Sequence, residues 1–317
     1  MYSFEEIHQA NITFLQNIKS SDSMTKEAQI SETSKYLKAQ VYEESFMERI
    51  LPAQTISPLM TDRDPDSPNA RVVIDKEFKD VKAVTTTFRG SASYNYAENE
   101  KYAVEFFKIE SEEVSLREGE IRDMRQPIQN IIRHRIAYEI RKKMDEMFIG
   151  MCNAAITASG NQLDLTGTGE KTITPENLID LRNLIDDQSP QYLEAATILM
   201  TKAQYNNVSK WIQANTAAGA GTMPGMAGGI TNEFWKDGYV YDKLFGLRVI
   251  VTQKSDLLPS NRVLLFTEPE YLGHHFTYND DRLAIEHKWD ILDMKGWRTF
   301  AAAIGNVNAV AELILDV

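Results

Sequence analysis

The segment from Pro127 to Ile156 constrains the fold of this chain more than any other. Apolar residues recur there in steps of three or four, the spacing of one face of an α-helix; they are Ile128, Ile132, Ile136, Ile140, Met144, Met147, Met151 and Ala155. About thirty helical residues give a rod of about 45 Å, far longer than the usual helix of a globular protein. Pro127 fits the first turn, where its missing N–H costs nothing; a helix that begins nearer Glu118 and kinks at Pro127 is the alternative.

After this helix the sequence alternates between helical and strand patterns. Thr174 and Pro175 form a helix start, with Thr as the N-cap and Pro in the first position. A buried strand is expected at Ala196–Met200 and a helix at Thr201–Ile212. Further strands are expected at Arg248–Val251, Arg262–Phe266, Thr299–Ile304 and Ala309–Leu315. The alternation predicts an α+β protein. Five glycines mark a flexible loop within residues 217–230: Gly219, Gly221, Gly225, Gly228 and Gly229.

The residues before the long helix predict an arm and a hairpin rather than a domain. Two short helical stretches, at residues 4–18 and 36–49, are separated by a polar segment and are too short to form a core. Between residues 60 and 112, dense charges separate three strand-like runs: Arg71–Ile74, Val81–Phe88 and Tyr102–Phe107. This pattern predicts a long, largely solvated two-stranded ribbon. Because such a ribbon is marginal alone in water, we expect it to rest on a partner surface.

The composition excludes several classes of protein. Hydrophobic residues make up 43% and charged residues 25% of the 317 residues, which argues against a disordered, collagen-like or membrane-bundle protein. The one cysteine, Cys152, cannot form an internal disulfide. We expect neither a secretory signal nor a transmembrane span, and hence a cytosolic product. The formal net charge of −12 argues against tight binding of duplex DNA, but not against a protein that merely surrounds DNA.

The long helix is the exception to this acidic balance. Residues 127–160 carry five basic and three acidic side chains. Three interpretations remain open: a solvated helix face, a basic strip that meets an acidic surface of a neighbouring subunit, or a strip that loosely faces nucleic acid.

No pattern of catalytic, cofactor-binding or metal-binding residues stands out. Residues 166–172 resemble a phosphate-binding loop, but Glu170 interrupts the motif and its first glycine is absent, so we expect a turn. Residues 62–66 begin like an EF-hand loop without the glycine and glutamate that it needs. Cys152 is expected to be a buried, inert thiol. Five histidines show no ligand spacing: His8, His134, His274, His275 and His287. We therefore expect no enzyme, no metal and no cofactor.

The order of these parts resembles the major capsid proteins of tailed double-stranded-DNA bacteriophages, which share the Hong Kong 97-type fold. That family has an N-terminal arm, an extended loop, a long spine helix in a peripheral domain, and an α/β axial domain. Three runs carry the local similarity: Ala196–Asn206, Gly246–Thr252 followed by Arg262–Phe266, and Ala301–Val317. The similarity is architectural and covers nearly the whole chain.

The resemblance implies a division of the chain into four parts. Residues 1–55 form the N-terminal arm and residues 56–112 the extended loop, a β-hairpin. Residues 113–172 and 283–308 form the peripheral domain, with its spine helix at 127–156. Residues 173–282 and 309–317 form the axial domain. In this division the glycine-rich loop, with Gly219, Gly221, Gly225, Gly228 and Gly229, lies near the symmetry axis of each ring of subunits.

The resemblance also implies self-assembly into hexamers and pentamers of an icosahedral shell that encloses double-stranded DNA without sequence-specific binding. Candidate subunit-interface residues lie on the hairpin and the spine helix: Arg71, Lys76, Lys79, Lys82, Arg89, Arg133 and Arg141. We expect a separate scaffolding protein, because few residues precede the hairpin, together with a portal and decoration proteins. The expected location is the virion, after assembly in the host bacterial cytoplasm, with no membrane partner.

Other interpretations stay open at this point. Some family members join Lys and Asn side chains between subunits, and Lys76, Lys79, Lys82, Asn306 and Asn308 are this chain's candidates. Boiled, reduced particles that run as monomers on a denaturing gel would exclude such a link. An encapsulin-type compartment shell of the same fold is the nearest alternative. An enzyme whose site is assembled only in three dimensions is the alternative of another class.

Overall fold

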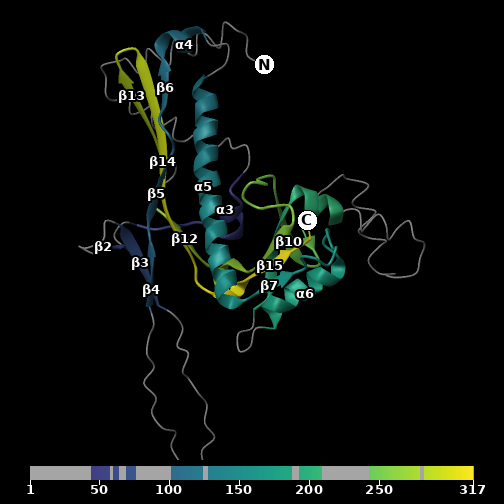
Figure 1. Cartoon of the computed structure of the whole chain (residues 1–317). Coiled ribbons are helices and arrows are strands. Elements are labelled where there is room, and N and C mark those ends of the chain that lie inside the picture. The colour runs from purple at the N-terminus through teal and green to yellow at the C-terminus, as the bar shows by residue number, and fades with distance from the viewer. Residues whose placement is uncertain are drawn as a thin grey trace, which may run out of the picture.

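The long helix lies along a sheet whose main strand is equally unusual in length. The computed structural model describes residues 44–57, 60–63, 69–75, 101–123, 128–187, 193–208, 243–278 and 282–316. Helix α5 (Ile128–Ser159) runs beside strand β14 (Ile291–Ile304), as Figure 1 shows. The predicted stripe is largely confirmed, because Ile132, Ile136, Ile140, Met144 and Ala155 are buried, whereas Met147 and Met151 are half-buried.

The first sheet, called here the peripheral sheet, is built around β14. Its path is β1 (Gln54–Thr55), β12 (Gly273–Thr277), β14 and β13 (Arg282–Lys288). The other edge of β14 pairs with β5 (Phe107–Glu110) and β6 (Val114–Arg117). Gly296 of β14 allows the helix to approach closely, since a Cβ there would lie 2.3 Å from Cγ2 of Ile136. A short helix, α4 (Glu118–Asp123), follows β6.

The second sheet, called here the axial sheet, has the order β7-β15-β11-β8-β10-β9. These strands are β7 (Gln162–Asp164), β15 (Val310–Ile314), β11 (Arg262–Thr267), β8 (Ala195–Thr201), β10 (Leu247–Thr252) and β9 (Lys243–Leu244). Helix α6 (Pro175–Asp186) packs on it through Leu178, Leu181 and Ile185. The Thr174 hydroxyl caps α6 by accepting from the Asn177 N–H, as the sequence predicts. Residues 202–208 after β8 are helical.

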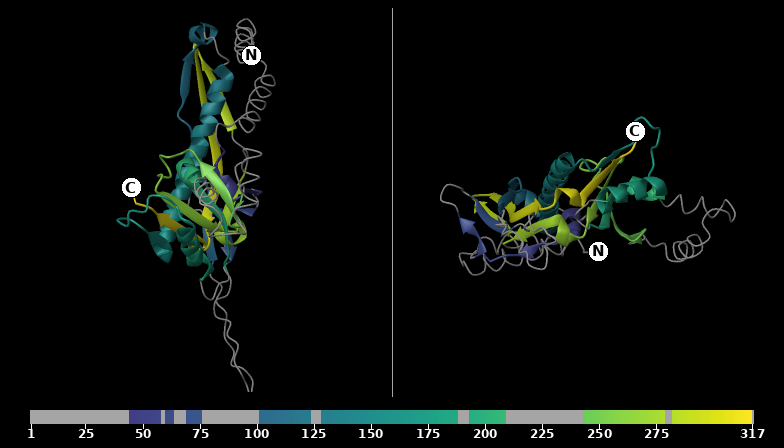
Figure 2. Two further views of the ribbon diagram at one scale, coloured as in Figure 1. Left: turned by 90° about the vertical axis from the view of Figure 1, so that its right-hand side faces the viewer. Right: turned by 90° about the horizontal axis from the view of Figure 1, so that it is seen from below.

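A third, three-stranded sheet forms the base of the predicted ribbon. It consists of β2 (Asp62–Arg63), β3 (Ala70–Asp75) and β4 (Lys101–Glu105), all antiparallel. The remaining described elements are short: α3 (Phe46–Ile50), α9 (Pro269–Leu272) and the 3-10 turn η2 (Val307–Ala309). The peripheral and axial sheets lie side by side rather than stacked, which Figure 2 shows in the view along α5.

The structure differs from the sequence expectations in several elements. Strands β12 and β13 and the first eight residues of β14 were not predicted. Helix α5 begins at Ile128 in the described part of the chain, and α4 runs in a different direction (Figure 1), but residues 124–127, where the alternative places its kink, lie outside the described residues. Strand β7, shortly after α5, was not predicted either. The helix at 4–18, the run at 81–88 and the glycine-rich loop lie outside the described residues.

Strand pairing also crosses the expected domain boundaries. β5 falls within the expected hairpin of residues 56–112 but pairs with β14. β7 falls within the expected peripheral segment but extends the axial sheet beside β15. β12 falls within the expected axial segment but lies in the peripheral sheet. The sheet in which each of these strands lies is thus decided by its pairing partner and not by its sequence neighbours.

Candidate subunit interface

The base of the ribbon is fixed to the peripheral sheet by a small apolar cluster. Val104 and Phe106 are buried there with Phe276 of β12 and Ala301 of β14. The Phe106 ring stacks on that of Tyr278, with 4.0 Å between ring centroids. This cluster fixes the direction in which the ribbon leaves the subunit.

Beyond this cluster the ribbon has little core of its own. The described side chains of β3 are half-buried or exposed, and Val104 is the one buried side chain of β4. Asp75 and Lys101 are opposite in register and form an ion pair of 3.2 Å between two mostly exposed side chains. Val72, Ile74 and Tyr102 pack against the Phe106 cluster but stay only half-buried toward this end. A ribbon with so little buried apolar surface is stable when another surface covers one face.

The structure describes only some of the candidate interface residues. Arg71 lies on β3 opposite Glu105, and its side chain is half-buried. Lys76, Lys79, Lys82 and Arg89 lie outside the described residues, as do all five glycines of the candidate axial loop. Arg133 belongs to α5, but its side chain is not described. Arg141 is 6% exposed and so offers little surface to a neighbour.

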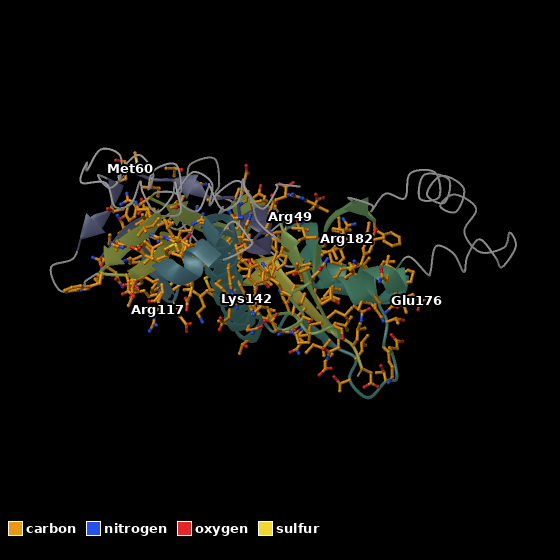
Figure 3. The ribbon with its side chains drawn as sticks, turned by 90° about the horizontal axis from the view of Figure 1, so that it is seen from above. Arg49, Met60, Arg117, Lys142, Glu176 and Arg182 are labelled. Atoms are coloured by element: carbon orange, nitrogen blue, oxygen red, sulfur yellow. The ribbon has the colours of Figure 1, made fainter. Side chains whose placement is uncertain are left out.

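The basic residues of α5 are largely engaged within the subunit. Lys142 forms an ion pair with Asp256, and Lys143 lies 2.8 Å from Glu146. Arg135 is exposed. Seen along the helix axis in Figure 3, Lys142 and Arg117 project from one long side of the molecule and Met60 from the other. Burial of Arg141 and the ion pairs of Lys142 and Lys143 engage three of the five cations of α5, which leaves less positive charge for the two interpretations that need a basic strip.

The segment at residues 44–51, called here the anchor segment, lies between the two sheets. The Ser45 hydroxyl caps α3 and donates a 2.6 Å hydrogen bond to Oδ1 of Asp145 on α5. The same carboxylate oxygen accepts from the Met47 N–H at 3.0 Å. The spine helix thus holds the start of α3 through one buried acid.

That acid is paired with a buried lysine from the axial side. Lys254 follows β10, and its Nζ lies 2.5 Å from Oδ2 of Asp145, with both side chains at most 1% exposed. Nζ also lies over the Phe46 and Tyr138 rings, at 5.5 and 5.9 Å from their centroids. Burial raises the pKa of Asp145 above its usual range, while Lys254 and the hydrogen bonds from Ser45 and Met47 oppose that shift.

Three more side chains complete the hold on the anchor segment. Arg298 of β14 lies 2.5 Å from a carboxylate oxygen of Glu48, and Nη1 of Arg248 on β10 donates to the Arg49 carbonyl at 3.3 Å. Nδ1 of His275 on β12 lies 3.1 Å from the Leu51 carbonyl oxygen and donates to it, since a carbonyl can only accept. Burial lowers the pKa of His275. The anchor segment therefore joins the peripheral sheet, the axial sheet and α5.

The sequence motifs that were considered as possible catalytic or binding sites have structural roles. Residues 166–169 are a turn in which the Thr166 N–H donates to Asp164 at 2.9 Å, and Gly167 and Gly169 take positive φ. Cys152 is fully buried, and burial raises the pKa of its thiol. In the described part of the chain no three His, Cys, Asp or Glu side chains are grouped to hold a metal. No helix among the described residues is long and apolar enough to cross a membrane.

Comparison with known protein families shows to which family the chain belongs. A sequence model of a family described as "Phage capsid protein" matches residues 113–312, more than half of the chain. The chain belongs to the phage capsid protein family. This capsid protein is a structural protein that self-associates into the shell of a phage particle, and it is not an enzyme. The virion is therefore its location.

Solved structures share the fold of this capsid protein at low sequence identity. One from Mycobacterium phage Bobi has a TM-score of 0.59 at 12% identity and covers 87% of this chain and 91% of its own. One from Microbacterium phage Oxtober96 has a TM-score of 0.57 at 13% identity, covering 86% and 91%. The "Asymmetric unit of bacteriophage PhiM1 mature capsid" gives 0.55 at 10%, covering 86% and 87%. The expected Hong Kong 97-type fold is thus confirmed. A sequence comparison with curated proteins finds no match.

Sequence reasoning missed the residues that join the two halves of the capsid protein. Ser45 lies 100 positions before Asp145, and Lys254 lies 109 positions after it. The spacing of Ser45 and Glu48 is that of a capping box and predicts the start of α3. Of the candidate cross-linking residues, Asn306 is occupied by an internal hydrogen bond, because its Oδ1 accepts from the Asn308 N–H at 3.1 Å.

Proposed function

We propose that this capsid protein builds an icosahedral shell of hexamers and pentamers in which the ribbon of each subunit lies on a neighbouring subunit. The observation that carries the proposal is the ribbon base, which is fixed at Phe106 but whose apolar side chains toward the Asp75–Lys101 end stay only half-buried. A neighbouring subunit supplies the surface that such a ribbon needs. Arg71 lies at this base, and Lys76, Lys79, Lys82 and Arg89 follow it in the sequence.

The charge of the chain supports a container for double-stranded DNA without sequence-specific binding. The net charge is −12, and a wall of the same sign as DNA does not trap it by counterion release. We include a separate scaffolding protein, a portal and decoration proteins as partners, and assembly in the host bacterial cytoplasm. Gly219, Gly221, Gly225, Gly228 and Gly229 are assigned to a loop at the ring axis, where conformational freedom suits both five-fold and six-fold rings.

A truncated ribbon tests this proposal. Because Asp75 and Lys101 are paired in register, residues 76–100 can be replaced by a two-residue Asn-Gly turn that closes the hairpin. The shortened protein is expected to keep the unfolding midpoint of the wild type, because the Phe106 cluster remains, and to lose shell formation in electron micrographs. Shells formed at the wild-type yield by this variant would overturn the proposal.

A further inference from the structure

The turn between β13 and β14 has a tryptophan at a position whose backbone conformation favours glycine. Lys288 and Ile291 are paired, so Trp289 and Asp290 form a two-residue turn. The φ angle is +61° at Trp289 and is not positive at Asp290. This combination of signs is that of a type II′ turn, whose first central residue is normally glycine. For a bulky side chain such a φ angle is an outlier that the rest of the structure must compensate.

A second turn of the same chain shows how the cost of a positive φ angle can be offset by side-chain packing. Among the described residues, Phe245 is the other non-glycine residue with positive φ, at 51°, in the β9–β10 turn. Its ring is half-buried and packs against the core of the axial sheet. Trp289, in contrast, is 94% exposed. The strain at Phe245 is offset inside the subunit, whereas the strain at Trp289 is not.

The end of the hairpin is nevertheless firmly supported. The Glu118 N–H donates to the Asp290 carbonyl at 2.8 Å, and Ile291 pairs with Arg117 of β6. Nε2 of His287 lies 2.6 Å from a carboxylate oxygen of Glu118. Figure 1 shows this end of the hairpin beside α4, at the end of α5 that is far from the axial sheet. The indole is therefore presented at an extremity of the molecule by a rigid base, which lowers the entropic cost of a contact.

We propose that the Trp289 indole is an anchor that packs against a second copy of this chain in the shell. The inference rests on the shell-forming function, which makes copies of the same chain the partners always present. Charges of both signs surround the turn, from Arg117, Lys288 and Arg122 to Glu113, Glu120 and Asp290. Such a mixed surface complements another copy of itself better than it complements a polyanion. Tryptophan and arginine are the residue types that dominate binding energy at protein interfaces.

Hydroxyl-radical footprinting of shells that contain this chain alone tests the contact. Cleavage after Lys288 and Lys295 releases a peptide that holds Trp289 and Met294. Oxidation of Trp289 is expected to fall at least tenfold between dissociated subunits and shells. Met294 is buried in the subunit and serves as the internal control, with little oxidation in either state. Equal oxidation of Trp289 in both states overturns the proposal, as does protection that appears only when another protein is bound.

A pair of glycine variants separates the anchor role from a structural one. Trp289→Gly relieves the backbone strain and removes a side chain that is 94% exposed, so the thermal midpoint stays or rises while the yield of shells falls at least tenfold. Phe245→Gly relieves similar strain but removes core packing, so its midpoint falls. Wild-type shell yield from Trp289→Gly overturns the proposal. The ribbon truncation reports separately on the proposed arrangement of subunits, because it leaves this end unchanged.

Discussion

At the residue scale, the buried carboxylate of Asp145 makes several contacts at once, including an ion pair with Lys254. Asp145 accepts from Ser45 and Met47 and pairs with Lys254, although all of these groups are removed from water. A buried ion pair of this kind adds little stability over an apolar pair of the same shape, but it is costly to break because the remaining charge stays buried.

The Asp145→Asn variant keeps the shape and leaves Lys254 without its counterion. We expect it to lower the free energy of unfolding by about 3–5 kcal/mol, measured by urea denaturation. The double variant Asp145→Asn, Lys254→Met is the control and should recover most of this loss, since neither charge is then buried. A double variant no more stable than the single one would contradict this account.

His275 makes a pH-dependent contribution at the same joint. Burial lowers its pKa below 6.5 in the folded protein, so the unfolded chain binds the proton first as the pH falls. The stability tied to neutral His275 is therefore complete above about pH 6.5 and decreases as the pH falls toward the lowered value. The loss of stability between pH 7.5 and 5.5 should be smaller in His275→Gln, whose amide can still donate to Leu51. An unchanged loss would show that His275 is not its source.

At the scale of elements, the close contact between α5 and β14 depends on a glycine in β14, which has no Cβ. A Cβ at Gly296 would lie 2.3 Å from Cγ2 of Ile136, so Gly296→Ala must displace the helix or its side chain. We expect a loss of about 1–3 kcal/mol in chemical denaturation. Gly150 in α5 is the matched control, because nothing lies within 4 Å of the position that a Cβ would take there. Gly150→Ala should stabilise by about 0.5–1 kcal/mol. The account fails if the two substitutions have the same sign.

The sequence predicted those elements whose apolar pattern is regular. Helix α5 and the mostly buried strands β8 and β11 follow such patterns, and Thr174 marks the start of α6. Strand β14 alternates between buried and half-buried residues over most of its length, but its buried face includes Gly296 and Arg298. A glycine that admits a helix and an arginine that reaches Glu48 interrupt the hydrophobic alternation. These choices depend on tertiary partners, which local sequence does not reveal.

The candidate interface was harder to predict than the fold. Arg141 was chosen as a surface cation of a charged helix, yet the helix buries it. Ser45 and Asp145 are 100 positions apart, and no local pattern connects them. Trp289 gives no periodic signal, because its exposure and positive φ are visible only once the β13–β14 turn is built. Which residues lie at an interface thus depends on the folded surface of the subunit and of its partner, and neither can be read from local sequence patterns.

At the scale of the whole molecule, the anchor segment connects the peripheral sheet, the axial sheet and α5. Phe46 is buried against Phe148 of α5, with 6.4 Å between ring centroids, and lies beneath Lys254. We expect Phe46→Ala to cost about 3–5 kcal/mol and to increase amide hydrogen exchange in both β12 and β10. Leu313→Ala in the axial core is the control and should increase exchange mainly in β15 and β11. Exchange confined to one sheet in Phe46→Ala would argue against a joint.

The single cysteine has a practical consequence for the assembled particle. Because Cys152 is the chain's one thiol and is buried within the subunit, a shell built of this chain alone presents no accessible sulfhydryl to maleimide reagents. A cysteine introduced at an exposed position such as Glu176 on α6 would then be the one reactive group per subunit. Dyes, peptides or metal clusters could be attached at uniform density, once per copy, without first removing a native residue.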